Sequence, residues 1–175
     1  YETLFAAVSV TLTEFAANPR WLGGSAAFTL VLHTWKQDLG RHVHLHALIP
    51  GGALSEAGEW KTTKRGFLFP VKALSRVFRG KFIAALVSAR DHGDLHAQID
   101  DWRHLLARLY QHEWVVYAKH SIGGPEQVLE YLARYTHRVA ISNERIMGVD
   151  KDSVSLRMRD SAHGNRRRTI HLPGE

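Results

Sequence analysis

Three histidines alternate with apolar residues at positions 42–47. Side chains in a β-strand point alternately to its two faces, so His42, His44 and His46 should share one face and leave an apolar face for the core. Neighbouring histidines of this set would lie about 6.6 Å apart at the backbone, close enough for two imidazoles to hold one ion. The outer two would lie about 13 Å apart, so one ion cannot easily take all three. The pattern predicts a metal site built on two of them, against the alternative of a solvated polar strand face.

Two tyrosines lie four residues apart in a segment with helical periodicity. Gly-Gly-Pro-Glu at 123–126 predicts a helix start, and the helix should run to about residue 137. Tyr131 and Tyr135 would then stack on one face. On spacing alone, two tyrosines on an apolar stripe are more often core residues. A phenol, with a pKa of about 10, is a weak nucleophile at neutral pH. A nearby cation that polarises a phosphate would relieve that handicap, so a catalytic role requires this face to meet a metal site.

Basic residues surround the expected tyrosine helix. Arg134 and Arg138 flank the tyrosines, and arginine forks grip phosphate through paired hydrogen bonds. Lys119 ends an expected strand just before the helix and could reach phosphate there, although a solvated strand end would explain it equally well. These three residues are our predicted phosphate-binding residues.

Composition limits the class of protein. The chain has 175 residues, 45% of them hydrophobic, which predicts one domain over 1–175 with a real core. Without cysteine it has no disulfides and no thiolate metal site, which suits a reducing cytoplasm. A net charge of +6 and a pI of about 9.8 favour a polyanionic partner. No apolar run is long enough to predict a membrane helix. The chain starts at Tyr1 without a methionine, and we expect a fragment of a longer protein.

The expected elements predict an α+β fold, with a mostly antiparallel central sheet flanked by helices. Residues 51–65 should form a loop, and residues 1–17 do not distinguish helix from strand. The expected helices are 72–89, 98–112 and 123–137, and the expected strands are 26–35, 42–49, 66–71, 114–119, 154–158 and 167–172.

Several blocks of the sequence resemble the bacterial two-tyrosine, HUH-type transposases of insertion sequences, which move by rolling-circle-like replication. Residues 32–35, HVHLH at 42–46 and 50–55 are similar to the His-hydrophobic-His block of that family. Further similar blocks are 67–75, 115–119, 123–129 and YLARYTHRVAISN at 131–143. The last block is long and specific, and the similarity runs from about residue 21 to residue 147.

The resemblance implies an HUH endonuclease-like fold and a defined chemistry. His44 and His46 would hold a divalent ion, Mg²⁺ or Mn²⁺. Tyr131 and Tyr135 would attack phosphates of single-stranded DNA at transposon ends and target, leaving 5′-phosphotyrosine links and free 3′-hydroxyls. For a third ligand we favour His33, then His42, then an unidentified acid. Family members usually carry a cysteine-rich, zinc-binding N-terminal segment, which this sequence does not show.

This interpretation places the enzyme in the bacterial cytoplasm. Two other functions remain as alternatives. A metal-dependent hydrolase on the histidine strand would require a water-activating acid, and no HExxH pattern occurs in the sequence. A non-catalytic remnant that only binds single-stranded DNA would need no more than the basic and aromatic residues. Oligomeric state is left open.

Overall fold

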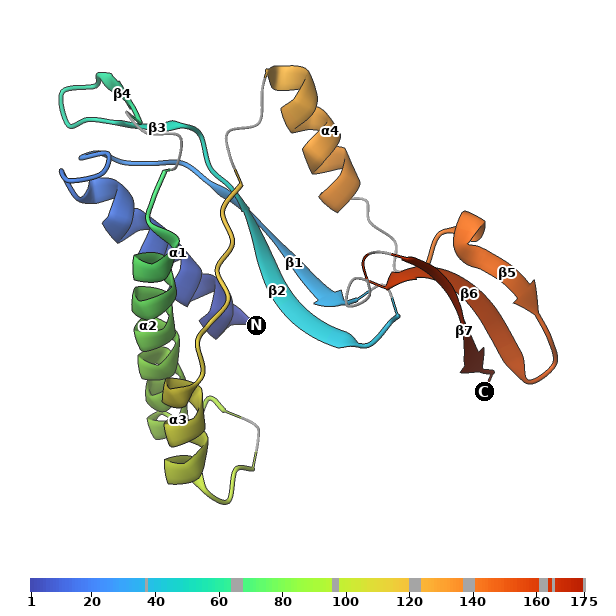
Figure 1. Ribbon diagram of the computed structural model, residues 1–175. Coiled ribbons are helices and arrows are strands. Elements are labelled where there is room, and N and C mark those ends of the chain that lie inside the picture. The colour runs from blue at the N-terminus through green and yellow to red at the C-terminus, as the bar shows by residue number, and fades with distance from the viewer. Residues whose placement is uncertain are drawn as a thin grey trace. The chain divides into compact units, whose positions relative to one another are not determined.

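The computed structural model describes residues 1–36, 38–63, 68–95, 98–119, 124–136, 141–160, 164 and 166–174, without the side chains of 125 and 134–136. Figure 1 shows the helices and strands. The helices are α1 (Glu2–Ala17), α2 (Val71–Asp91), α3 (Trp102–Gln111), α4 (Pro125–Thr136) and the short 3-10 helix η1 (Asn143–Arg145). The strands are β1 (Thr29–Trp35), β2 (Arg41–Leu48), β3 (Gly52–Leu54), β4 (Trp60–Thr62), β5 (Ile146–Val149), β6 (Ser153–Asp160) and β7 (Arg166–Pro173).

The predicted α+β class and its antiparallel pairing are confirmed. The described strands form three separate sheets, in the orders β1-β2, β3-β4 and β5-β6-β7. The expectation of a loop over 51–65 was wrong in part, because β3 and β4 pair there as a short hairpin. The expectation of a strand over 66–71 was also wrong in its described part. Residues 68–70 are in no strand, and α2 begins at Val71, directly after a proline that suits a helix start.

Residues group into two compact units, each built from two chain segments. The first unit comprises 1–30 and 47–123, and the second comprises 31–46 and 124–175. In the first unit, α1 packs against α2, and Lys81 of α2 forms an ion pair with Glu14 of α1 at 2.6 Å. The helices and the β3 region share one apolar core, formed by Leu12, Ala16, Leu22, Ala53, Phe69 and Leu74. Residues 1–17, left undecided from the sequence, are thus helical, with one face packed in this core.

An extended segment follows α3 and runs beside α2 (Figure 1). Its anchor is Trp114, whose ring contacts Phe78 and Phe82 at centroid distances of 5.2 Å. The Ser75 hydroxyl donates a hydrogen bond to the carbonyl of Trp114. Along 113–119 burial alternates: Val115 is 94% exposed and Tyr117 79% exposed, whereas Val116 packs against the core. The segment has the alternation that predicted a strand, yet it joins no ladder with the described strands.

In the second unit, β5, β6 and β7 form a continuous antiparallel sheet. The register places Leu156 of β6 opposite both Ile146 of β5 and Ile170 of β7. Leu156 is fully buried, and its neighbours on the same face are mainly apolar. The alternation of apolar and polar residues along β6 therefore selects one face for the core.

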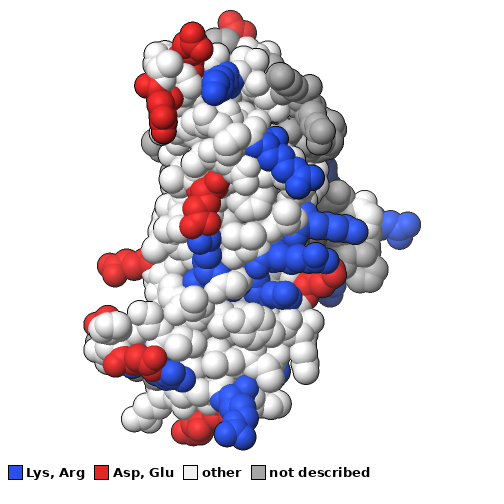
Figure 2. All heavy atoms as spheres, turned by 90° about the vertical axis from the view of Figure 1, so that its left-hand side faces the viewer, with Lys and Arg blue, Asp and Glu red and all other residues white. Residues whose placement is uncertain are grey.

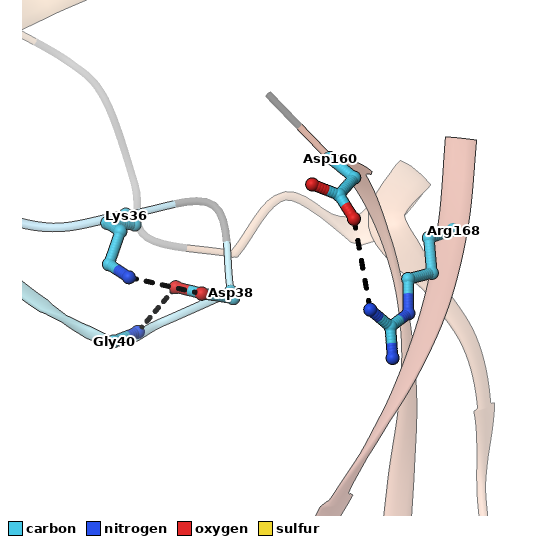
Figure 3. Close-up of polar contacts among 5 residues, drawn as sticks. All are labelled: Lys36, Asp38, Gly40, Asp160 and Arg168. Atoms are coloured by element: carbon cyan, nitrogen blue, oxygen red, sulfur yellow. Dashed lines mark hydrogen bonds and ion pairs between the residues drawn. The ribbon is translucent and has the colours of Figure 1, made fainter. Parts of the chain in front are cut away.

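A tight turn joins β1 to β2 (Figure 3). The Asp38 carboxylate accepts a 2.9 Å hydrogen bond from the Gly40 backbone N–H and lies 3.5 Å from the Lys36 ammonium. Backbone atoms of Lys36 and Gly40 also bond, at 2.9 Å. The Gly40 hydrogen bond, helped by the charge of Lys36, holds the pKa of the Asp38 carboxyl below its usual value. The turn fixes how β1 and β2 meet, and hence how their side chains face one another.

Candidate metal and nucleophile site

Strands β1 and β2 bring three histidines together. The ring centroids of His33 and His46 lie 4.5 Å apart, those of His44 and His46 4.9 Å apart, and those of His33 and His44 5.4 Å apart. One nitrogen from each ring lies within 4.8 Å of the other two. His33 is only 3% exposed, so its ring nitrogens need polar partners within the protein. The cluster could hold a metal ion.

The choice between the histidines of β2 follows from this geometry. His42 lies 4.7 Å from His44, ring to ring, so the shared face predicted by the alternation is present. His42 nevertheless lies outside the group whose nitrogens converge, and His33 of the neighbouring strand completes that group. A cluster built across two strands is more compact than one spread along a single strand, because paired strands lie about 4.8 Å apart.

Hydrogen bonds indicate which nitrogens remain for an ion. Nδ1 of His44 lies 3.1 Å from the His42 carbonyl oxygen, to which it can donate. Histidines that bind metals commonly donate their second nitrogen to a carbonyl in this way, which leaves Nε2 for the metal. Nε2 of His46 is buried, and its Nδ1 faces Tyr131.

Helix α4 presents Tyr131 to this cluster. The helix begins at Pro125 with Glu126 in its first turn, as the sequence predicts. Val128, Tyr131 and Leu132 are half-buried, whereas the residues between them are exposed, so these three mark the packed face. The phenolic oxygen of Tyr131 lies 3.4 Å from Nδ1 of His46, which makes the contact a polar one. A purely aliphatic packing role for Tyr131 does not fit this placement.

Comparison with known proteins supplies the family. A family model described as "Putative transposase" (Y2_Tnp) matches residues 27–175. The chain belongs to this transposase family. It is 46% identical over 179 residues to "Putative transposase y4qJ" of Sinorhizobium fredii (strain NBRC 101917 / NGR234), covering 97% of this chain and 45% of that protein. It is 27% identical over 122 residues to "Transposase for insertion sequence element IS801" of Pseudomonas savastanoi pv. phaseolicola, covering 66% of this chain and 29% of that one.

The transposase relatives are longer than the chain, which spans less than half the length of each. No solved structure matches it. Among the described residues, no helix combines the length and apolar character needed to cross a membrane. The expected resemblance to bacterial insertion-sequence transposases is confirmed.

The structure describes only some of the other residues that were predicted to belong to the site. Tyr135 and Arg134 lie in α4, but their side chains fall outside the described part of the structure, and Arg138 falls outside it altogether. Lys119 is exposed at the end of the extended segment of the first unit. The contributions of these four residues stay predictions.

One residue at the site was missed by the sequence reasoning. The ring of Trp35 stacks on His33, with centroids 6.1 Å apart and planes 17° apart. Trp35 follows His33 by two positions in β1, so both project from one strand face. This spacing was the available signal. The nearly parallel indole borders the His33 ring on this strand face.

Basic side chains also gather outside the site. Figure 2 shows lysine and arginine side chains massed in the middle of one face, with acidic ones scattered around them. In the first unit, exposed basic residues on α2 and α3 include Lys72, Arg76, Arg103 and Arg108. Exposed positive charge on these helices does not by itself mark a binding face.

Proposed function

We propose that this chain is the catalytic part of a transposase that nicks single-stranded DNA and holds the 5′ phosphate on tyrosine. The observation that carries the proposal is the position of the Tyr131 hydroxyl, 3.4 Å from a histidine of the converging cluster. A potential nucleophile and a potential metal site, distant in sequence, thus lie side by side. Family membership supports DNA as the substrate.

His33, His44 and His46 would hold the divalent ion. Bound there, the ion would supply Lewis acidity and stabilise the charge that develops on the scissile phosphate. Three imidazoles suit Mn²⁺ better than Mg²⁺, because Mg²⁺ prefers oxygen ligands. Trp35 borders His33, and the His42 carbonyl orients His44.

Tyr131 would be a nucleophile. Its oxygen forms a bond to phosphorus while the bond from phosphorus to the 3′-oxygen of the preceding nucleotide breaks. The phenolic proton is lost to solvent, and the departing 3′-oxygen gains one, so a free 3′-hydroxyl results. The phosphotyrosine bond conserves the energy of the phosphodiester, and a 3′-hydroxyl can attack it in turn without ATP. Tyr135, one helical turn later, would be the second nucleophile.

Positively charged residues close to α4 in the sequence would hold the substrate strand. Arg134 and Arg138 offer forks for phosphate, and Lys119 offers a point charge. In this proposal their role is binding, so their loss would weaken affinity and leave the chemistry of a bound strand in place.

A covalent-adduct assay tests the proposal. The chain is incubated with Mn²⁺ and a single-stranded oligonucleotide labelled at its 3′ end, and the products are separated on a denaturing gel. We expect a labelled protein band that EDTA prevents and that the double variant Tyr131→Phe, Tyr135→Phe lacks while still binding the oligonucleotide. Binding without any adduct would instead favour the non-catalytic remnant. Cleavage that releases label without an adduct would favour a metal-dependent hydrolase.

A further inference from the structure

The β5-β6-β7 sheet has an exposed face that is rich in arginine. Residues directly opposite in an antiparallel ladder project to the same side, and the register pairs Arg157 with Thr169 and Arg159 with Arg167. These three arginines are exposed, and they belong to the side opposite the buried Leu156. The sheet therefore has one mainly apolar face and one face that carries three exposed arginines.

Asp160, the acidic residue at the end of β6, lies on the opposite face of the sheet from these arginines. Asp160 follows Arg159 in β6, so it projects to the face of Leu156 and lies 3.8 Å from Arg168 (Figure 3). Among the described strand residues on the arginine face, none is acidic. The register places Arg159 directly opposite Arg167, so two arginines share this part of the face.

Polar side chains extend this face along the sheet. The Ser155 hydroxyl and Nδ1 of His171 lie 2.8 Å apart, across β6 and β7. A bulge between Ile146 and Gly148 brings Met147 to Arg157, whose Nη2 lies 2.9 Å from the Met147 sulfur. This contact holds the Arg157 guanidinium next to β5.

We propose that the arginine face, formed by Arg157, Arg159 and Arg167, binds the phosphodiester backbone of DNA beyond the reacting nucleotides. Arginine forks match phosphate geometry, and backbone contacts position a strand without reading its sequence. The strands of this sheet contain no Phe, Trp or Tyr, so we expect contacts to the sugar-phosphate backbone to dominate over base stacking. The proposal rests on the proposed function for the identity of the polyanion.

The test is fluorescence anisotropy with the intact chain in EDTA, so that the histidine cluster binds no metal. The probes are a single strand, a duplex and a strand of abasic sugar-phosphate. The variant is Arg157→Gln, Arg159→Gln, Arg167→Gln. Its control, Arg76→Gln, Arg103→Gln, Arg108→Gln, removes the same charge from exposed positions on α2 and α3. Thermal unfolding followed by circular dichroism checks that both variants fold.

We expect the variant with three substitutions in the sheet to bind single strands about ten-fold more weakly. The slope of log affinity against log salt concentration should become shallower by about 2, because each lost phosphate contact removes roughly 0.7. The abasic strand should lose as much as the normal strand, and the control variant should lose clearly less. Equal losses in both variants, or no change in slope, would overturn the proposal. If the sheet variant unfolds, Arg167→Gln alone, with an expected slope change of about 0.7, replaces it. The adduct assay reads the tyrosine chemistry separately, so an adduct with an unchanged slope rejects this face alone.

Discussion

The phenolic oxygen of Tyr131 lies 3.4 Å from Nδ1 of His46, across 85 positions of sequence. The two residues come from a helix and a strand that share the second compact unit. Helical spacing selects the face of α4, and strand alternation selects the face of β2. Their meeting is a property of the tertiary structure.

The first prediction concerns the division of labour between the tyrosines. With Tyr131→Phe alone we expect residual nicking through Tyr135, and loss of strand-transfer product, because only one covalent strand can then be held. The measurement follows the joined product on a gel with two labelled strands. Tyr117→Phe, at a tyrosine that is 79% exposed in the first unit, is the control. Normal strand transfer by Tyr131→Phe would contradict the assignment.

The second prediction concerns the third metal ligand. His33→Ala should weaken Mn²⁺ binding by about 10- to 100-fold, as expected when a group that completes or orients a metal site is lost. Titration calorimetry, or the loss of the free-ion paramagnetic resonance signal, measures the affinity. His104→Ala, an exposed change on α3, should leave it unchanged. An unaltered Mn²⁺ affinity in His33→Ala would exclude this residue as a ligand. Mg²⁺ should bind the unmodified chain more weakly than Mn²⁺ does.

A third prediction concerns pH and the β1–β2 turn. The folded-state pKa of Asp38 is lowered, so its ionised carboxylate stabilises the fold above the unfolded-state pKa, and this contribution is lost as pH falls through the folded-state value. Asp38→Asn should therefore cost less than about 1 kcal/mol at pH 7, since the turn is solvent-exposed. The cost should shrink below about pH 4, near the ordinary value for aspartate. Urea unfolding at several pH values provides the measurement. If the loss of stability caused by Asp38→Asn stayed constant down to about pH 3, the ionised carboxylate would not be its source.

The fourth prediction concerns the core of the β5-β6-β7 sheet. Leu156 is fully buried, so Leu156→Ala should destabilise the sheet by about 2–5 kcal/mol through lost transfer energy and a cavity. Val149→Ala, at an exposed position of the same sheet, should change stability by less than about 1 kcal/mol. Hydrogen exchange at the β6 amides detects local destabilisation, and a similar protection in both variants would contradict the assigned register.

Sequence patterns predicted the local elements better than their partners. The alternation around His44 and the Pro-Glu start of α4 are short-range signals, and both elements formed where expected. The β3-β4 hairpin was not predicted, because each of its strands has only three residues. Such a short strand is too short to show a recognisable alternation of apolar and polar residues. The sequence already favoured His33 over His42 as the additional histidine, and the converging group contains His33. The pairing of β1 with β2 that brings His33 there is a tertiary contact, which no local pattern encodes.

The interleaved chain path has a consequence for dissecting the gene. All three converging histidines precede residue 123, whereas Tyr131 follows it, although one unit contains all four. Cutting the coding sequence at that boundary would give two polypeptides, one with the candidate metal ligands and the other with the candidate nucleophile. Neither could form the adduct alone, so its recovery on co-expression would report their reassembly. The chain thus offers a natural position for a split-protein design, in which DNA joining depends on bringing two fragments together.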